Sequence, residues 1–439
     1  MTAPREPAPL SPDAFAKRLG RLGAPRRFAF AVSGGRDSMA LARLAAAYVE
    51  RTGAEVFAFT VDHGLRAASA GEALEAQGWC ADLGLPHRIL HWDGVKPSSA
   101  VQAEARAARY KLLIAACEHE HCEAILTAHT LSDQAETLLM RLARGAGPRG
   151  LSAMRAEGFI AAGAGAPLRL LRPLLDWSRA EITDYLAREG QAFLDDPSND
   201  DARFERVRVR ALLDEARDLL PEAQLAETAR RMADADARLR AQEDALFNKF
   251  GGCLYGWGGV SLARWAPDAP CAAGLARRLI HAAGAGDHPP EESAASDAMT
   301  GAADGGAATL GGALIQRWKG ALWIFREPAA LLGRAGVAPL GPERLDGPML
   351  WDRRFILESM GEGFSGAAEV RPLGAGAAAL LGARAALFDG PPEALCAQPG
   401  LFSSGGLIGA PTLPFMDSGP AAAKPLISER FAGETVRFA

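Results

Sequence analysis

The sequence has few cysteines, and their spacing matches neither a metal site nor a disulfide framework. The 439 residues include six cysteines, at positions 80, 117, 122, 253, 271 and 396, and no two of them form a Cys-x-x-Cys motif. Scattered cysteines are typical of a protein from a reducing compartment. The sequence also lacks an apolar run of membrane-spanning length, and its first ten residues lack the apolar core of a signal peptide. We therefore expect a cytoplasmic protein with no membrane partner.

The chain has no excess of positive charge. Its 48 Lys and Arg residues face 53 Asp and Glu residues, which gives a formal net charge of −5. A nucleic-acid partner would therefore have to be held by local basic patches. The apolar content of 49% and the charged content of 23% are typical of a globular protein, and the length allows two or three domains.

The most informative motif is Phe-Ala-Val-Ser-Gly-Gly-Arg-Asp-Ser at residues 30–38. A short apolar run leads into it, and a run of good helix formers follows from Met39. A strand, a glycine turn and a helix in that order surround a concave spot with backbone N–H groups, and such a spot binds phosphate. The motif fits neither the Walker A pattern nor Gly-x-Gly-x-x-Gly. The predicted phosphate-binding residues are Ser33, Gly34, Gly35, Arg36, Asp37 and Ser38.

Strands and helices alternate from residue 25 to about residue 145. We expect strands at 27–32, 55–61, 86–92 and 124–128, and helices at 38–51, 69–83, 100–119 and 132–144. This alternation predicts an α/β fold with a doubly wound parallel sheet that is covered on both faces. Residues 33–38, 62–66 and 129–136 each follow a strand end, so we expect them to converge on one site.

The remaining sequence predicts further elements and a division into domains. We expect a loop at 145–170, a helix beginning after Ser178, a long helix at 222–250, a loop at 283–309 and a β-hairpin at 314–325. We divide the chain into an N-terminal extension (1–24), a nucleotide-binding catalytic domain (25–218), a helical linker with a second domain (219–330) and a small C-terminal α+β domain (335–439).

Two acidic residues stand three apart at the start of the fourth helix. Asp133 and Glu136 share one helix face, and His129 precedes them at a strand end. Acids at this position offset the helix dipole. They could equally bind a cation, either a substrate ammonium or Mg²⁺, and the residues alone leave both interpretations open.

Six segments, taken in series, resemble the tRNA(Ile)-lysidine synthases, which are N-type ATP pyrophosphatases with a PP-loop. The segments lie at 33–38 (SGGRDS), 62–66 (DHGLR), 104–110 (EARAARY), 127–137 (TAH…DQAET), 141–151 (RLARG…GL) and 196–199 (DPSN). The resemblance covers roughly residues 25–215 and is loose beyond them. That family uses ATP to join lysine to the wobble cytidine of a CAU anticodon. The resemblance therefore implies ATP with Mg²⁺, L-lysine and tRNA(Ile) with a CAU anticodon as ligands.

The resemblance also implies roles for single residues. It places the phosphates at residues 33–38, adenine at Val61, Asp62 and His63, Mg²⁺ at Asp37, and lysine at Asp133 and Glu136. Arg106 and Arg109 would offset negative charge during adenylation and act with Asp37 in catalysis. The residues expected to contact tRNA are Arg141, Arg144, Arg203, Arg206 and Arg208. The last three lie near the C-terminal end of the catalytic domain. We expect the small C-terminal domain to bind tRNA as well.

The sequence departs from the family pattern in two places. Thr130 and Ser132 stand where the family commonly has a second histidine and an aspartate, and Val207 follows Arg206 where asparagine is common. The missing histidine and carboxylate favour a tRNA-binding paralogue without activity, whereas the intact loop at 33–38 opposes it. A tRNA thiolase would need cysteine pairs, and a GMP synthetase would need a glutaminase domain; neither is evident. The oligomeric state stays open, a homodimer included.

Overall fold

The structure, a computed structural model, separates into two compact units. It describes residues 9–64, 68–93, 101–161, 167–195, 203, 205–286, 288–334, 338–345, 349–359, 368–416, 421–432 and 436–438. The first unit comprises residues 1–162, 167–238 and 439, and the second comprises residues 163–166 and 239–438. The predicted motif residues Leu65, Arg66 and 196–199 lie outside the described residues.

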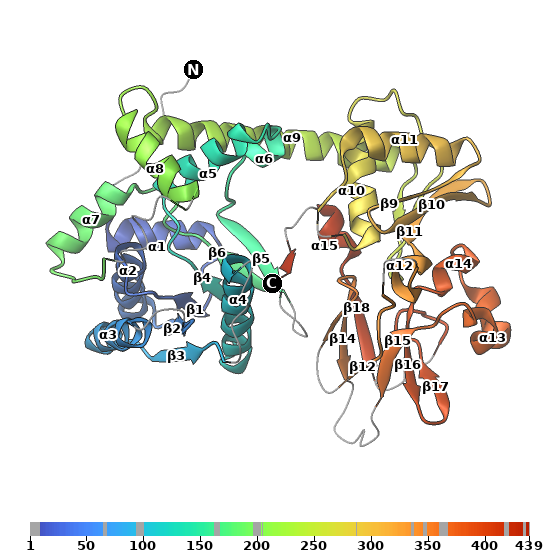
Figure 1. Cartoon of the computed structure of the whole chain (residues 1–439), viewed down its shortest axis with the longest axis horizontal. Coiled ribbons are helices and arrows are strands. Elements are labelled where there is room, and N and C mark those ends of the chain that lie inside the picture. The colour runs from blue at the N-terminus through green and yellow to red at the C-terminus, as the bar shows by residue number, and fades with distance from the viewer. Residues whose placement is uncertain are drawn as a thin grey trace. The chain divides into compact units, whose positions relative to one another are not determined.

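The first unit alternates strands and helices as predicted (Figure 1). Its elements are α1 (Pro12–Arg21), β1 (Arg27–Ala31), α2 (Arg36–Thr52), β2 (Glu55–Asp62), α3 (Ser69–Asp82), β3 (His87–His91), α4 (Val101–His119), β4 (Ala124–Leu126), α5 (Leu131–Ala143), α6 (Pro148–Leu151), β5 (Glu157–Ala161), β6 (Leu168–Leu171), α7 (Arg179–Arg188) and α8 (Glu205–Glu215). The long helix α9 (Glu222–Lys249) follows, and the division between the units falls inside it.

The strands of the first unit form a doubly wound sheet, which confirms the predicted fold class. Their order is β5-β6-β4-β1-β2-β3, and all neighbouring pairs are parallel except β5 with β6. The chain proceeds from β1 to β2 and β3 on one side and then returns to place β4 on the other side. The strand order therefore reverses between β1 and β4, and ligands of such sheets bind in the crevice at this point.

Alternating side chains of β1 enter two separate cores. Phe28 and Phe30 are buried with residues of α1, α2 and α7, whereas Ala29 is buried with residues of α4. Figure 1 shows α2 and α4 on opposite sides of these strands. Burial of both faces explains why β1 reads as a continuous apolar run. It also fixes the end of β1, where the phosphate loop begins.

A buried hydrogen-bond chain ties the ends of the central strands together. The Thr60 hydroxyl donates to the Val32 carbonyl oxygen at 2.9 Å, so it accepts from His87 Nε2, which lies 2.8 Å away. His87 Nδ1 is then left without a partner in the part of the chain described here. Burial lowers the pKa of His87 to about 4, because desolvation disfavours the charged form of the ring. The neutral ring thus holds the strand end that precedes Ser33.

The second unit contains antiparallel sheets with helices packed on them. Its elements are β7 (Cys253–Leu254), β8 (Val260–Leu262), α10 (Ala272–Gly284), α11 (Glu292–Ala303), β9 (Ala307–Leu310), β10 (Ala313–Trp318), β11 (Ala321–Arg326), α12 (Pro328–Leu332), β12 (Glu343–Arg344), β13 (Met349–Trp351), β14 (Phe355–Ser359), β15 (Glu369–Pro372), α13 (Ala377–Leu381), the 3₁₀ helix η2 (Gly382–Leu387), α14 (Pro392–Leu395), β16 (Pro399–Ser403), β17 (Gly406–Gly409), β18 (Ala421–Pro425), α15 (Ile427–Ala432) and β19 (Val436–Phe438). The predicted hairpin is confirmed as β10 and β11, which lie in a sheet of order β7-β8-β11-β10-β9.

Two segments expected to be loops contain regular structure. Within 145–170, β5 pairs antiparallel with β6, and Ile160, Leu168 and Leu170 fill the core beneath α4. Within 283–309, α11 packs on α10 through Ala295, Met299 and Ala302, which recur at helical spacing. The glycine and alanine content suggested flexibility, but alanine is also the best helix former. Both loop predictions were wrong for these stretches.

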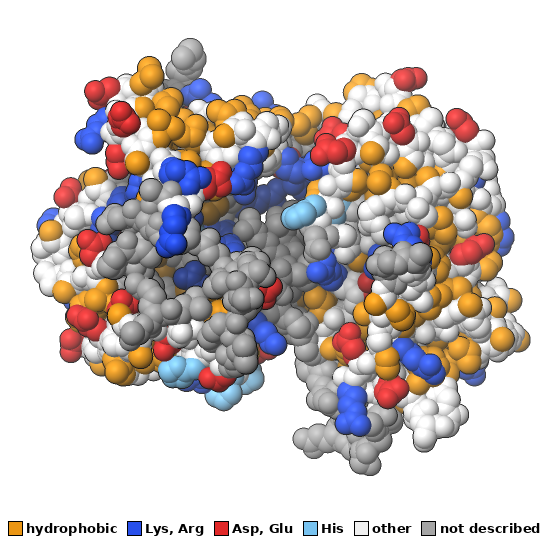
Figure 2. Space-filling view, viewed as in Figure 1, with side chains coloured by type: hydrophobic (Ala, Val, Ile, Leu, Met, Phe, Trp, Pro, Cys, Tyr) orange, Lys and Arg blue, Asp and Glu red, His pale blue; other side chains and the backbone are white. Residues whose placement is uncertain are grey.

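The described surface mixes both signs of charge. Lys and Arg side chains are interspersed with acidic and hydrophobic ones on the face drawn in Figure 2. Of the helices in the described part of the chain, none has the length and apolar character that a bilayer crossing requires.

Candidate active site

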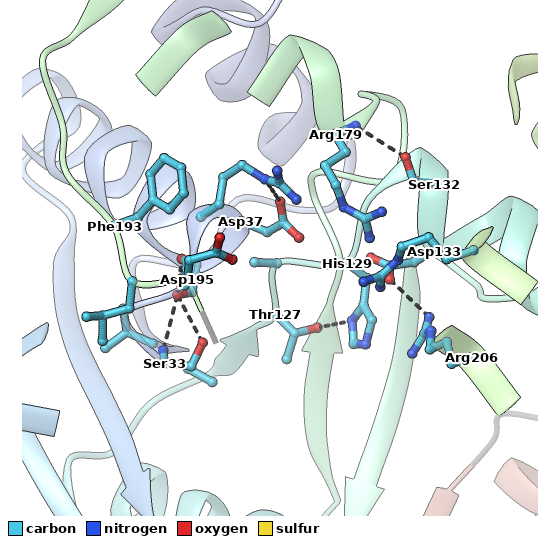
Figure 3. Close-up of a pocket in the computed structure, with 18 of the residues that line it drawn as sticks. Ser33, Asp37, Thr127, His129, Ser132, Asp133, Arg179, Phe193, Asp195 and Arg206 are labelled. Carbon is cyan, nitrogen blue, oxygen red and sulfur yellow. Dashed lines mark hydrogen bonds and ion pairs between the residues drawn. The ribbon is translucent and has the colours of Figure 1, made fainter. Parts of the chain in front are cut away.

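A cavity of about 1280 Å³ lies in the first unit at the carboxyl ends of its strands. Its walls come from the turn between β1 and α2, the end of β2, helices α4, α5, α7 and α8, residues 193–195 and the start of α9. The cavity brings together parts of the three segments that the sequence predicted to converge, namely residues 33, 35–38, 61–63, 129, 132 and 133, whereas Gly34 and residues 134–136 do not line it. Figure 3 labels side chains from the first and the third of these segments around the cavity.

The phosphate loop is held in shape by its two serines. The Ser38 hydroxyl donates to the Gly35 carbonyl oxygen at 2.8 Å and accepts from the Ser33 N–H at 3.1 Å. Gly35 caps the N-terminus of α2, so the first-turn N–H groups of this helix lie at the cavity wall. Such an arrangement suits an anion, and phosphate binding by this loop stays a prediction.

A side chain at Gly34 would be strained and would require Leu194 to move. Gly34 has a φ of +77°, and an added Cβ would lie 2.6 Å from Leu194 Cδ1. The Leu194 N–H also donates to the Gly34 carbonyl oxygen at 2.8 Å. Residues 193–195 therefore lie against the back of the loop and fix its path.

We expect Gly34→Ala to weaken ATP binding and to lower the melting temperature, because alanine is strained at this φ and the Leu194 side chain, which packs on the loop, must move to admit the methyl group. Calorimetric titration with ATP and thermal unfolding measure the two effects. Gly53→Ala is the matched control: its φ is +68° at the other end of α2, but no atom lies within 4 Å of the added Cβ. The control should cost roughly 1 kcal/mol of stability and leave ATP binding intact. Equal ATP affinity in Gly34→Ala and the wild type would contradict the assignment of this loop.

Asp37 is the carboxylate of the phosphate loop, and it lines the cavity. Burial raises the pKa of Asp37, and the Arg36 guanidinium, whose Nε lies 3.3 Å from Oδ1, offsets part of that rise. No group of three or more potential metal ligands is present in the described residues. A single carboxylate beside a phosphate site still fits Mg²⁺, which takes few protein ligands when phosphate oxygens and water complete its shell.

The residues predicted to hold adenine form one wall of the cavity. Val61, Asp62 and His63 all line it, and the Asp62 carboxylate accepts from the Gly64 N–H at 2.9 Å. Burial opposes ionisation of Asp62, but the hydrogen bonds from Gly64 and Ser69 outweigh it, so the pKa of Asp62 is lowered. The carboxylate is thus an ionised acceptor that fixes the turn.

The two predicted catalytic arginines of α4 lie in different surroundings. Arg109 lines the cavity. Arg106 lies over the Tyr110 ring, with its guanidinium carbon 5.1 Å from the ring centroid and Nη2 3.3 Å from the Tyr110 hydroxyl. Arg106 is not part of the cavity wall, so Arg109 is the better placed of the two to meet a substrate.

His129 lines the cavity between Asp37 and Asp133, as Figure 3 shows. Its Nδ1 lies 2.9 Å from the Thr127 hydroxyl. Burial, followed by the nearby charges of Arg172 and Arg206, holds the pKa of His129 well below its usual value. The ring is therefore neutral at physiological pH.

Asp133 and Glu136 lie together, and both are engaged by arginines. Asp133 closes a capping box with Thr130 at the start of α5 and binds Arg206 Nη2 at 3.0 Å. Glu136 is fully buried and contacts Arg206 Nε at 2.6 Å, Arg210 Nε at 3.0 Å and Arg179 Nη2 at 3.4 Å. Asp133 thus caps the start of α5, and its role toward lysine stays a prediction.

The arginines predicted to contact tRNA differ in their surroundings. Arg141 donates to the carbonyl oxygens of Gly150 and Ala153, and Arg206 is bound to the acidic pair. Arg144 pairs with Glu205 at the start of α8. Arg203 and Arg208 are exposed, and Arg208 donates to the Arg203 carbonyl oxygen at 2.9 Å. Their contacts with RNA stay predictions.

Sequence reasoning gave no role to Ser132 and Glu222, which meet in the cavity. The Ser132 hydroxyl donates to Glu222 Oε2 at 2.6 Å. The two residues stand 90 positions apart, and Glu222 begins helix α9. No local motif connects them, so no signal within either segment could have found the pair.

Comparison with known proteins finds, over most of the chain, the family that the six sequence segments resemble. Residues 13–216 match the PP-loop domain family. A Methylobacterium nodulans protein named tRNA(Ile)-lysidine synthase is 38% identical over 343 residues, which span 74% of this chain and 98% of that protein. Proteins of the same name from Methylobacterium sp. strain 4-46 and Ruegeria pomeroyi are 41% and 36% identical. These alignments cover 73% and 88% of this chain, and 96% and 88% of those proteins.

Proposed function

This chain belongs to the tRNA(Ile)-lysidine synthase family, and from that premise we propose that it joins L-lysine to C2 of the wobble cytidine of a CAU-anticodon tRNA(Ile). ATP drives the reaction, which changes the codon read from AUG to AUA. The observation that carries the proposal is the single cavity that joins a phosphate loop to an amino-acid end lined with carboxylates. We place the reaction in the cytoplasm.

The first step is adenylation of the cytidine. The cytidine O2 attacks the α-phosphorus of ATP, the bond to the β-phosphate breaks, and pyrophosphate leaves. Ser33, Ser38 and the first turn of α2 hold the phosphates, while Val61, Asp62 and His63 hold adenine. Asp37 would bind Mg²⁺ together with phosphate oxygens, and the ion would offset charge on the phosphates. Arg109 is placed to offset the remaining negative charge.

The second step is attack by the lysine side chain. The ε-amine attacks C2, and O2 leaves as part of AMP. Adenylation has thereby turned a poor leaving group, the cytidine oxygen, into a good one. The amine must be unprotonated, whereas its pKa in water is about 10.4. A carboxylate paired with this amine would raise that pKa further. The acids of the site therefore serve the lysine best by binding its α-ammonium or by accepting the proton released during attack.

Two observations favour lysine transfer over sulfur transfer. A tRNA thiolase would need cysteines at the site, and no cysteine lines the cavity in the part of the chain described here. Asp133 lines the same cavity as the phosphate loop, so an amino acid held beside it can reach a nucleotide, whereas Glu136 contacts Arg206 without lining the cavity. For the tRNA itself, we propose that Arg203 and Arg208 contact phosphates, because both are exposed.

The proposal is tested with an in-vitro transcript of a CAU-anticodon tRNA, ATP and radiolabelled lysine. We expect label on the transcript together with release of AMP and pyrophosphate. The control transcript carries uridine at the wobble position and should stay unlabelled. AMP release with another co-substrate, without lysine on the tRNA, would reject the assignment.

A further inference from the structure

Glu222 reaches the cavity from the start of α9 and is held there by a buried serine. Ser132 is fully buried, and its hydroxyl accepts from the Arg179 N–H at 3.3 Å. The same hydroxyl donates to Glu222 Oε2 at 2.6 Å. Figure 3 shows Ser132 and Arg179 in contact at this end of the cavity. The incoming N–H sets the direction of the hydroxyl proton, so Ser132 aims it at the carboxylate.

The carboxylates of α5 are already neutralised within the protein. Asp133 accepts from the Thr130 N–H at 2.8 Å and pairs with Arg206. Glu136 is surrounded by the guanidinium groups of Arg179, Arg206 and Arg210. A substrate ammonium would have to displace these arginines in order to bind either acid. Displacing them from the fully buried Glu136 would leave several guanidinium groups without their anion, which is costly.

Glu222 differs from the α5 acids in its partners. It contacts the neutral Ser132 hydroxyl, and within the described residues it has no cationic partner. It is half-buried and lines the cavity. A partly desolvated carboxylate with one lone pair fixed and no paired cation is a strong acceptor for an ammonium group.

We propose that Glu222 binds the α-ammonium of the amino-acid substrate and that Ser132 is its positioning residue. The inference rests on the proposed function, and it identifies Glu222 as the residue that recognises the α-ammonium and so distinguishes an amino acid from a simple amine. Glu222 serves the α-ammonium because the ε-amine has to lose its proton, and a carboxylate contact would retain that proton. Ser132 stands where the resembling family commonly has an aspartate. In this chain the carboxylate of Glu222, from helix α9, thus lies beside that position.

A substrate analogue separates the α-ammonium from the rest of lysine. 6-Aminohexanoate is lysine without its α-amino group, and it can be measured as a competitor of labelled lysine. In the wild type we expect 6-aminohexanoate to bind about 10- to 100-fold more weakly than lysine, because it lacks one hydrogen bond between charged groups. In Glu222→Gln the lysine KM should rise by the same factor, while the inhibition constant of 6-aminohexanoate should change less than about twofold.

The matched control is Glu227→Gln in the same helix. Glu227 pairs with Arg230 and Arg231 one turn further along and is not part of the cavity wall. We expect this variant to keep the wild-type ratio between lysine and 6-aminohexanoate. A Glu222→Gln variant that still discriminates between the two compounds as the wild type does would overturn the inference.

Ser132→Ala provides a second test that keeps the carboxylate in place, should Glu222→Gln fold poorly. It should raise the lysine KM several-fold, with kcat and the affinity for 6-aminohexanoate unchanged, because only the α-ammonium contact is loosened. An equal effect on both compounds would assign Ser132 and Glu222 a general structural role and overturn the inference. Absence of lysine transfer by the wild type would overturn the proposed function, and the inference with it.

Discussion

Asp37→Ala abolishes AMP formation on a CAU-anticodon transcript, with a loss of roughly 10³-fold or more in kcat. Asp37 is the carboxylate of the phosphate loop, and without it the loop retains N–H groups and hydroxyls but no anion for Mg²⁺. Single-turnover assays with α-labelled ATP measure the loss directly. Glu50→Gln, at an exposed position of the same helix, is the control and should turn over at the wild-type rate.

Loss of activity at Asp37 is not a loss of folding. Burial raises the pKa of Asp37, which means that its ionised form at neutral pH is less stable in the folded state than in the unfolded state. Asp37→Asn removes that penalty, so its melting temperature should equal or exceed that of the wild type while its activity is lost. An Asp37→Asn enzyme that keeps its turnover would show that this carboxylate has no part in the chemistry.

Glu136→Ala destabilises the first unit by about 2–4 kcal/mol. Glu136 is fully buried and contacts Arg179, Arg206 and Arg210, so its removal takes this anion from all three guanidinium groups and leaves Arg206 with Asp133 alone. The loss is at the lower end for a buried pair because Arg206 is itself 41% exposed, and water screens it. Urea unfolding followed by circular dichroism measures the change.

Glu205→Gln is the control for this prediction. It breaks an ion pair with Arg144 in which both side chains are exposed, by 42% and 61%, so the expected cost is below about 1 kcal/mol. We also expect Glu136→Ala to impair lysine transfer, because Arg206 loses its position beside Asp133. If Glu136→Ala were no less stable than Glu205→Gln, the buried cluster would not contribute to folding as described.

The sequence predicted the features that depend on neighbouring residues. The strand and glycine turn before α2 appear as expected, because apolar runs and glycine positions are local signals. The start of α7 after Ser178 is confirmed as a capping box with Glu181, and α9 runs from Glu222 to Lys249 as one helix. Convergence of three loops followed from the rule that parallel strands end at one edge.

The features that the sequence did not predict depend on tertiary contacts. Arg206 was predicted to contact tRNA, yet in the structure it pairs with Asp133 and Glu136 at the cavity. The Ser132 and Glu222 pair forms because α9 begins beside α5, which no local pattern reveals. The antiparallel strand β5 is short and contains Gly158 and Ala161, so its pairing with β6 determines its conformation.

The central claim is tested most directly by mass spectrometry of the modified tRNA. A CAU-anticodon transcript is incubated with the enzyme, ATP, Mg²⁺ and lysine and then digested to nucleosides. The account predicts that the wobble cytidine gains the mass of one lysine less one water. A mass gain that corresponds to sulfur in place of oxygen, or an unchanged cytidine, would contradict it.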